Sequence, residues 1–232
     1  SLRAPMAMSV KPPLEDIRVA VDRALAEDLG GGDVTAQLLP PGARARAAVI
    51  CRERAVLCGG DWFSQVFARL DAGIKVRWAL ADTQEMAPGQ TVCTVDGPAR
   101  AVLSGERTAL NFLQTLSGTA TAARRYADAV AGLPVILLDT RKTLPGMRDM
   151  QKYAVRCGGC RNHRRGLYDA ILIKENHIQV LGSVAAAVAA ARRIHPGMPV
   201  EIEVETLEQL EQAIAAGADL VLLDNFTPDA MR

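Results

Sequence analysis

Positive charge gathers between Arg141 and Arg165 in a pattern that could bind a small anion with several charges. This segment holds eight Lys and Arg residues and a single acid, Asp149, whereas the net charge of the whole chain is only +1. Apolar runs at 135–139 and 170–174 flank it and have the composition of buried strands. Arg and Lys donate charge-assisted hydrogen bonds, so cations held between buried strands indicate an anion site. The eight cations are Arg141, Lys142, Arg148, Lys152, Arg156, Arg161, Arg164 and Arg165.

Charged residues also stand at the ends of the other runs that look like strands. The run 170–174 ends in Lys174, and the run 220–224 ends in Asp224. In parallel α/β folds the functional site lies at the carboxyl ends of the strands. We therefore expect cations from two neighbouring strands, and acids from the next two, to line one site.

The run 200–204 alternates glutamate with branched apolar residues. Strand side chains point to opposite faces in turn, so Glu201, Glu203 and Glu205 are predicted to share one face. The apolar residues between them are predicted to face covering helices. Carboxylates on a buried face need cations or a metal beside them, and we expect Lys174 and a divalent cation in that place.

Two further motifs could suggest other chemistry. Cys157 and Cys160, with His163, have the spacing of part of a zinc site, but the sequence offers no second pair of ligands. A tight glycine turn near a ligand is the preferred interpretation of this motif. Gly30–Asp33 lacks the preceding strand and the Lys-Ser or Lys-Thr of a phosphate loop, and it is interpreted as a turn.

The first half of the chain has the pattern of a small α+β domain. Helical spacing of apolar residues predicts helices over Leu14–Leu29 and Asp61–Leu70, with short β-type runs between glycines and prolines. A long helix is expected to start near Ser104, to break or to pack tightly at Gly118, and to end at Gly132.

The second half alternates short apolar runs with helical patterns, which predicts a parallel sheet. The helical patterns lie at Asp149–Arg156, Val180–Arg193 and Leu207–Ala216. A closed barrel of eight strand–helix units takes about 250 residues, whereas 100 residues follow Gly132. We therefore expect either an incomplete barrel or a parallel sheet that is not a barrel.

Composition excludes several broad classes of protein. The near-neutral charge argues against a general nucleic-acid binder, and Tyr153 is the only aromatic residue among the clustered cations. No apolar run approaches the roughly 20 residues that cross a membrane, and no secretory signal is recognised. Five cysteines, an odd number, fit reduced thiols better than a disulfide framework. We expect a soluble, cytoplasmic protein that binds neither nucleic acid nor membrane.

Six segments of the chain resemble the quinolinate phosphoribosyltransferase family of type II phosphoribosyltransferases. They follow the family's order and cover nearly the whole chain, and several are long and specific. Cys160 departs from the family, which more often has a third glycine in this turn. The segments are EDLGGGDVT (27–35), GERTALNFLQTLSGTAT (105–121), DTRKTLPGMR (139–148), NHRRGLYDAILIKENH (162–177), EIEVETLEQL (201–210) and LVLLDNF (220–226).

The resemblance implies a fold, a reaction and an assembly. The expected fold is an N-terminal α+β sandwich domain over residues 10–118 and a parallel α/β barrel over residues 119–232. The C-terminal part of the barrel, with the loops that grip the 5-phosphate, is expected to be absent from this chain. The implied reaction joins quinolinate to 5-phosphoribosyl-1-pyrophosphate with Mg²⁺ and releases pyrophosphate and CO2. Its product is nicotinate mononucleotide, a precursor of NAD, and the family works as a homodimer or higher homo-oligomer.

Matching motifs carry the family's substrate-binding roles onto residues of this chain. The resemblance implies that Arg141, His163, Arg164 and Lys174 hold the two carboxylates of quinolinate. Arg107 is implied to reach the site across the subunit interface.

The remaining implied roles concern the phosphoribosyl donor. Thr140 and Lys142 are expected on the quinolinate and pyrophosphate side. Glu203 and Asp224 are expected to bind the ribose hydroxyls or the Mg²⁺, directly or through the Mg-bound donor. The expected catalytic residues are Lys142, Lys174, Glu203 and Asp224.

Two alternatives stay open on the sequence alone. One is a related type II phosphoribosyltransferase that acts on another aromatic acid. Two arginines and a histidine favour a dicarboxylate over a monocarboxylate. The other is a truncated, non-catalytic relative that binds a ligand or a partner.

Overall fold

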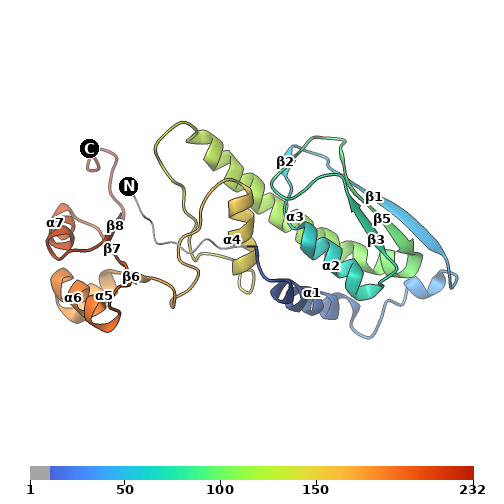
Figure 1. The fold of residues 1–232 in the computed structure, drawn as a ribbon, viewed down its shortest axis with the longest axis horizontal. Coiled ribbons are helices and arrows are strands. Elements are labelled where there is room, and N and C mark those ends of the chain that lie inside the picture. Colours follow the sequence, from blue (N-terminus) through green and yellow to red (C-terminus); the bar gives the residue numbers. More distant parts are fainter. Residues whose placement is uncertain (1–10) are drawn as a thin grey trace. The chain divides into compact units, whose positions relative to one another are not determined.

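The computed structural model describes residues 11–232, and this part of the chain divides after His163 into two compact units (Figure 1). The expected boundary between residues 118 and 119 falls inside a continuous helix of the first unit. The expected first domain begins at residue 10, which lies just outside the described residues.

Two small antiparallel sheets form one part of the N-terminal unit. The larger has the strand order β1 (Arg44–Ile50), β5 (Thr91–Pro98) and β3 (Lys75–Trp78). The smaller pairs β2 (Ala55–Val56) with β4 (Glu85–Met86). The short β-type runs predicted in this half are therefore confirmed as strands.

Helices make up the rest of the unit: α1 (Leu14–Leu29), the 3₁₀ helix η1 (Ala36–Leu38), α2 (Gly60–Leu70), α3 (Ala99–Ala129) and α4 (Arg148–Cys157). α1, α2 and α4 all pack against the long helix α3 (Figure 1). α1 matches its predicted bounds, because its apolar residues recur every three or four positions and bury one face. Gly30, with φ of 50°, ends it as a glycine at a helix terminus does.

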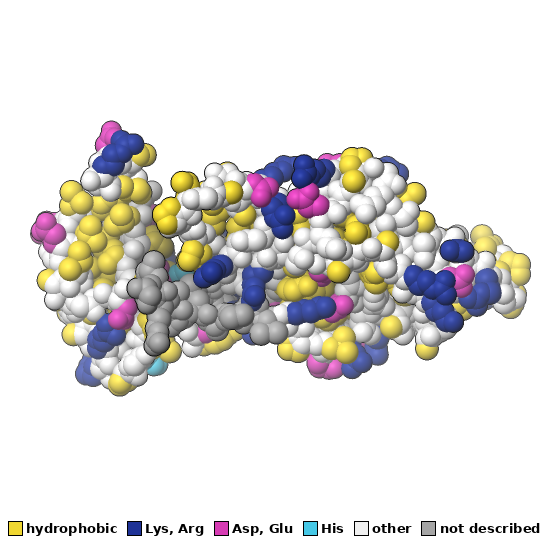
Figure 2. Space-filling view, turned by 45° about the horizontal axis from the view of Figure 1, so that its top comes forward, with side chains coloured by type: hydrophobic (Ala, Val, Ile, Leu, Met, Phe, Trp, Pro, Cys, Tyr) yellow, Lys and Arg dark blue, Asp and Glu magenta, His cyan; other side chains and the backbone are white. Residues whose placement is uncertain are grey.

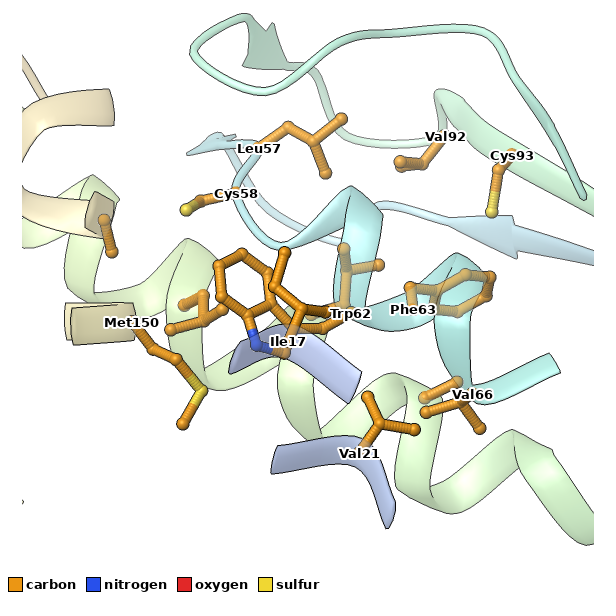
Figure 3. Close-up of a cluster of buried hydrophobic side chains, with 14 of the residues drawn as sticks. Ile17, Val21, Leu57, Cys58, Trp62, Phe63, Val66, Val92, Cys93 and Met150 are labelled. Atoms are coloured by element: carbon orange, nitrogen blue, oxygen red, sulfur yellow. The ribbon is translucent and has the colours of Figure 1, made fainter. Parts of the chain in front are cut away.

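The core of this unit lies where α1, α2, α3 and the sheets meet (Figure 3). Trp62 and Phe63 of α2 are 1% exposed, and the ring of Phe63 lies 5.3 Å from that of Trp78 on β3. Trp62 lies 5.8 Å from the ring of Tyr153, so α2 also contacts α4 through aromatic side chains. These contacts fix α4, which carries several of the clustered cations.

The long helix corrects the expectation for Gly118. α3 begins at Ala99, earlier than Ser104, and runs unbroken past Gly118, where a Cβ would meet nothing within 4 Å. The close approach occurs instead at Gly105, where a Cβ would lie 2.6 Å from Leu70 Cδ1. The sequence pattern located a small residue in this helix correctly but assigned the packing role to the wrong glycine.

The C-terminal unit is a parallel three-stranded sheet in the order β6-β7-β8, with helices between its strands. Val200, Ile202 and Val204 of β7 are fully buried and pack against α6 and α7, as the alternating pattern predicts. The elements are β6 (Ile171–Ile173), α5 (Glu175–Leu181), α6 (Val184–Ile194), β7 (Val200–Val204), α7 (Leu207–Ala215) and β8 (Leu220–Leu223).

Two predicted elements differ from the structure. The helix expected over Val180–Arg193 is two helices, because Gly182 adopts φ of 87° between them. The run 135–139 is not a regular strand: its pairing is a single parallel bridge from Leu138 to Arg161. Its apolar residues suit a strand, but a strand also needs a partner along its length. Arg161 bonds to this run at Leu137 O (2.9 Å) and at the Asp139 N–H (3.0 Å), and among the described residues 135 and 136 belong to no sheet.

Charges of both signs are interspersed over the N-terminal unit on the face shown in Figure 2, in keeping with the small net charge. Within residues 11–232, no helix combines the length and the apolar character that crossing a membrane requires.

Candidate functional site at the strand ends

The carboxyl ends of the three parallel strands place a cation and two acids at one edge of the C-terminal sheet. Ile173 pairs with Ile202, so Lys174, the next residue, lies opposite Glu203. Lys174 Nζ donates to Glu203 Oε2 at 2.6 Å, and the Glu203 side chain is only 11% exposed. The predicted pairing of Lys174 with the glutamate face is therefore confirmed.

The neighbouring carboxylates of this edge differ in their settings. Asp224 follows β8, and its backbone N–H donates to Val204 O at 2.9 Å, which fixes it beside the end of β7. Glu201 and Glu203 share the partly buried face of β7, but Glu205 lies beyond the strand and is exposed. Only two of the three predicted glutamates thus belong to the strand face.

In the N-terminal unit a buried ion pair anchors the loop that carries Thr140, Arg141 and Lys142. Lys152 of α4 is 1% exposed, and its Nζ lies 2.5 Å from Asp139 Oδ1. A buried pair of charges is costly unless further hydrogen bonds satisfy both groups. Lys152 Nζ also donates to the carbonyl of His163 at 3.0 Å, which meets part of that need.

The same carboxylate organises the segment around His163. The backbone N–H of His163 donates to Asp139 Oδ1 at 2.8 Å, and Asn162 Nδ2 donates to Asp139 Oδ2 at 2.6 Å. Asn162 also donates to Lys152 O at 2.9 Å. Asp139 therefore joins Thr140 and Arg141 on one side to His163 on the other. Asn162 has no motif that would predict this role, because only the fold brings it to Asp139.

Residues 140–143 form a compact turn held by the start of α4. Thr140 Oγ1 accepts a hydrogen bond from the backbone N–H of Lys142 at 3.0 Å, and Arg148 Nη2 donates to Arg141 O at 3.3 Å. Arg141 Nε is buried and has no hydrogen-bond partner within the described chain. A buried donor without a partner is costly, so this guanidinium is suited to an anionic ligand.

The other predicted cations have separate positions. Arg107 lies exposed on α3 and has no ion-pair partner in the part of the chain that the structure describes. Arg164 is the first residue of the C-terminal unit, and its Nη1 donates to Ala170 O at 3.3 Å. Within the N-terminal unit the structure thus brings Thr140, Arg141, Lys142 and His163 together, while Arg107 stands apart on α3.

The structure does not bring Cys157, Cys160 and His163 together as a zinc site would require. Cys160 Sγ donates to Ala123 O at 3.3 Å, and burial raises the pKa of this thiol. Cys157 faces Cys58 instead, in the one group of potential metal ligands found among residues 11–232, which Asp82 completes. The predicted glycine turn is present, with Gly159 at φ of 99° and Gly158 packed closely on the α3 backbone.

These features define an α/β protein of the class that presents charged residues at the carboxyl ends of parallel strands, as enzymes with anionic substrates do. The family profile described as "Quinolinate phosphoribosyl transferase, N-terminal domain" matches residues 33–117, and the profile of its C-terminal domain matches residues 119–232. The chain belongs to the quinolinate phosphoribosyl transferase family.

Individual relatives agree with this membership. The chain is 41% identical to "Probable nicotinate-nucleotide pyrophosphorylase [carboxylating]" of Bacillus subtilis, over 89% of this chain and 72% of that protein. It is 43% identical to the Mycobacterium leprae nicotinate-nucleotide pyrophosphorylase [carboxylating], over 90% and 75% of the two chains. The solved structure of the Francisella tularensis nicotinate-nucleotide pyrophosphorylase superposes with a TM-score of 0.94 and 45% identity, covering 97% of this chain and 80% of that one.

Proposed function

We propose that this protein transfers the phosphoribosyl group of 5-phosphoribosyl-1-pyrophosphate to quinolinate and decarboxylates the product. Nicotinate mononucleotide, pyrophosphate and CO2 are the products, and the step supplies NAD biosynthesis. The observation that carries the proposal is the 41–43% identity to named carboxylating nicotinate-nucleotide pyrophosphorylases over about nine tenths of the chain.

The cations assigned to quinolinate by the family resemblance suit a pyridine dicarboxylate. An Arg fork binds a carboxylate through two parallel hydrogen bonds, and Arg141 has an unused buried donor at Nε. Lys174 Nζ has three protons, and its bond to Glu203 uses one of them. Its side chain is 42% exposed, so the other two can reach a ligand. We assign quinolinate binding to Arg141, Lys174, His163 and Arg164.

Thr140 and Lys142 are assigned to the side where quinolinate meets the pyrophosphate. The Thr140 hydroxyl holds the backbone of Lys142, which fixes the turn from which the exposed Lys142 side chain extends. A cation there favours departure of the pyrophosphate, because it stabilises the negative charge that develops on the leaving oxygen.

The two acids at the strand ends fit Mg²⁺ by the chemistry of their donor atoms. Mg²⁺ prefers carboxylate oxygens and keeps several waters. Lys174 occupies Glu203 Oε2, which leaves Oε1 of Glu203 and the carboxylate of Asp224 to hold the ion or the ribose hydroxyls. When bound, the ion would neutralise charge on the pyrophosphate.

The transfer itself needs no nucleophilic side chain. Positive charge develops at the anomeric carbon as the bond to pyrophosphate breaks, as it does in glycosyl transfer, and the Glu203 carboxylate can stabilise it. After transfer the ring nitrogen is cationic, and its charge stabilises the electron pair that the departing CO2 leaves on the adjacent ring carbon, which then takes up a proton. The residues of this chain therefore orient the reactants and complement their charges.

Assembly and location complete the proposal. Arg107 is exposed and has no ion-pair partner within the described residues, which suits a side chain that serves the site of a second subunit in a homodimer or larger homo-oligomer. All five cysteines are free, which suits a reducing, cytoplasmic location.

The decisive experiment follows carbon from labelled quinolinate. With purified full-length protein, CO2 release from the labelled carboxyl group is expected to require both the phosphoribosyl donor and Mg²⁺. Release with neither, or no release under any of these conditions, would contradict the proposal. Binding of quinolinate is compared with that of nicotinate, and stronger binding of the monocarboxylate would favour a related enzyme for another aromatic acid.

A further inference from the structure

Two cysteines that are distant in the sequence meet inside the N-terminal unit. Cys58 lies just before α2, Cys157 is the last residue of α4, and their sulfur atoms lie within 4.8 Å of each other. Figure 3 shows the Cys58 sulfur on the side of the core where Met150 of α4 lies. An S–S bond is about 2.05 Å long, so the two sulfurs need to approach by at most about 2.8 Å.

The two thiols differ in their surroundings. Cys157 lines a cavity of about 160 Å³ together with Lys11, Tyr153 and Arg156, and this volume admits a small oxidant. A hydrogen bond from the Cys58 thiol lowers the pKa of Cys157. The same contact with Cys157, and then burial, raises the pKa of Cys58. Cys157 therefore forms the reactive thiolate more readily, while Cys58 keeps its proton.

The neighbouring carboxylate of Asp82 already has structural partners. It accepts hydrogen bonds from the backbone N–H groups of Gly59 and Gly60, both at 3.1 Å, and from the Tyr153 hydroxyl at 2.9 Å. These bonds satisfy the start of α2 and attach α4 to it. Lys11, which pairs with Asp61, and Arg156 place positive charge on the cavity wall. That charge favours an anionic Cys157 thiolate and opposes a bound metal cation, whereas the Asp82 carboxylate acts against the thiolate.

We propose that Cys157 and Cys58 form an oxidant-sensitive dithiol that closes to a disulfide when a hydroperoxide reaches the cavity. The Cys157 thiolate attacks one peroxide oxygen, an S–O bond forms, the O–O bond breaks, and the leaving oxygen takes up a proton. The Cys58 sulfur then attacks the Cys157 sulfenic acid, the S–S bond forms, and water departs with the Cys58 proton. Sulfur is oxidised and the peroxide is reduced, by two electrons in all.

The disulfide would tie the segment before α2 to the end of α4. α4 carries Lys152 and Arg148, which hold the loop of Thr140 and Arg141. A thiol reductant would reverse the link. Both sulfurs and the cavity belong to the N-terminal unit, so the dithiol is independent of the proposed transfer reaction.

The test uses the full chain, treated with hydrogen peroxide, then unfolded in denaturant with an alkylating reagent and mapped by mass spectrometry without reduction. We expect a cross-linked peptide that contains Cys58 and Cys157, with Cys51, Cys93 and Cys160 alkylated, and expect dithiothreitol to reverse it. The mapping needs no variant, so it is independent of whether a variant folds. Cys160→Ser is the matched control and is expected to form the same cross-link, whereas Cys58→Ser is expected to stop at oxidised Cys157.

Three results would overturn the proposal. One is a cross-link of Cys157 to Cys160, and another is alkylation of both Cys58 and Cys157 after a treatment that oxidises other cysteines. The third is binding of one equivalent of Zn²⁺ by the unaltered protein that Cys58→Ser and Cys157→Ser each abolish, which would make the pair a metal site.

Discussion

The buried ion pair of Lys152 and Asp139 anchors the loop of Thr140 and Arg141 in the N-terminal unit. Removing one charge would leave the other buried without a partner, and such changes typically cost about 3–5 kcal/mol. We expect Lys152→Met to lower the free energy of unfolding by that amount, measured by denaturant titration. Lys75→Met, on the exposed side of β3, is the matched control and is expected to change it by less than about 0.5 kcal/mol.

A double-mutant cycle measures the interaction between the two charges separately from the other contacts of each side chain. Asp139→Asn removes the other charge, so Asp139→Asn combined with Lys152→Met is expected to be less destabilised than the sum of the single variants, by roughly 1–3 kcal/mol. Additive losses would show that the two charges do not stabilise one another.

Arg141 differs from its neighbours because its buried Nε has no partner in the described chain. If this donor serves a quinolinate carboxylate, Arg141→Ala weakens quinolinate binding by roughly 2–4 kcal/mol, about 30-fold or more. Arg141→Lys keeps the charge but loses the fork, and it is expected to restore little affinity. Calorimetric titration with quinolinate measures both variants, and unchanged affinity in Arg141→Ala would refute the role.

Within α3, alanine substitutions at its two glycines are expected to change stability in opposite directions. A Cβ at Gly118 meets nothing within 4 Å, so Gly118→Ala is expected to stabilise the protein by about 0.5–1 kcal/mol through lower entropy of the unfolded chain. A Cβ at Gly105 would lie 2.6 Å from Leu70, so Gly105→Ala is expected to destabilise it by about 1–3 kcal/mol. Thermal unfolding compares the pair, and equal shifts would contradict the packing.

Asp219 links α6 to the start of β7, because it accepts from Arg192 at 2.8 Å and from the Val200 N–H at 2.7 Å. The Arg192 bond, and then the backbone bond, hold the pKa of Asp219 below its ordinary value of 3.8. A carboxyl with a lowered pKa stabilises the fold above its unfolded pKa and loses this effect as pH falls through the folded pKa.

We therefore expect Asp219→Asn to lose roughly 0.5–1 kcal/mol at neutral pH, since the pair is partly exposed and screened. The difference from the unaltered protein is expected to shrink as the pH falls below about 4. Unfolding at a series of pH values measures this. Glu211→Gln, an exposed carboxylate of α7, is the control and is expected to change stability by less than about 0.5 kcal/mol throughout.

Sequence patterns predicted elements wherever one face is buried against a neighbour in the same unit. The spacing of Ile17, Val21 and Leu25 was enough for α1, and the alternation of 200–204 was enough for β7 and for the face of Glu203. The run 135–139 failed because strand formation depends on a partner that composition does not reveal. The anchoring of Asp139 by Lys152 and Asn162 could not be predicted either, since those contacts join separate segments.

At the scale of the whole molecule, the two units have cores of unequal size. The N-terminal core cluster contains 22 buried residues and the C-terminal one contains eight, counted over residues 11–232. A smaller core removes less apolar surface from water, so it stabilises its unit less. We expect the C-terminal unit to unfold first.

The position of the tryptophans makes this order measurable. Both tryptophans of the chain, Trp62 and Trp78, belong to the N-terminal unit, so their fluorescence reports that unit, whereas far-ultraviolet circular dichroism reports the helices of both. The denaturant midpoint by circular dichroism is expected to lie below the midpoint by fluorescence. Ile202 is a fully buried residue of β7, and Ile202→Ala is expected to destabilise the C-terminal core by about 2–5 kcal/mol. The substitution is therefore expected to lower only the circular dichroism midpoint and to widen its distance from the fluorescence midpoint. Coincident transitions that move together in Ile202→Ala would show instead that the two cores unfold as one cooperative unit.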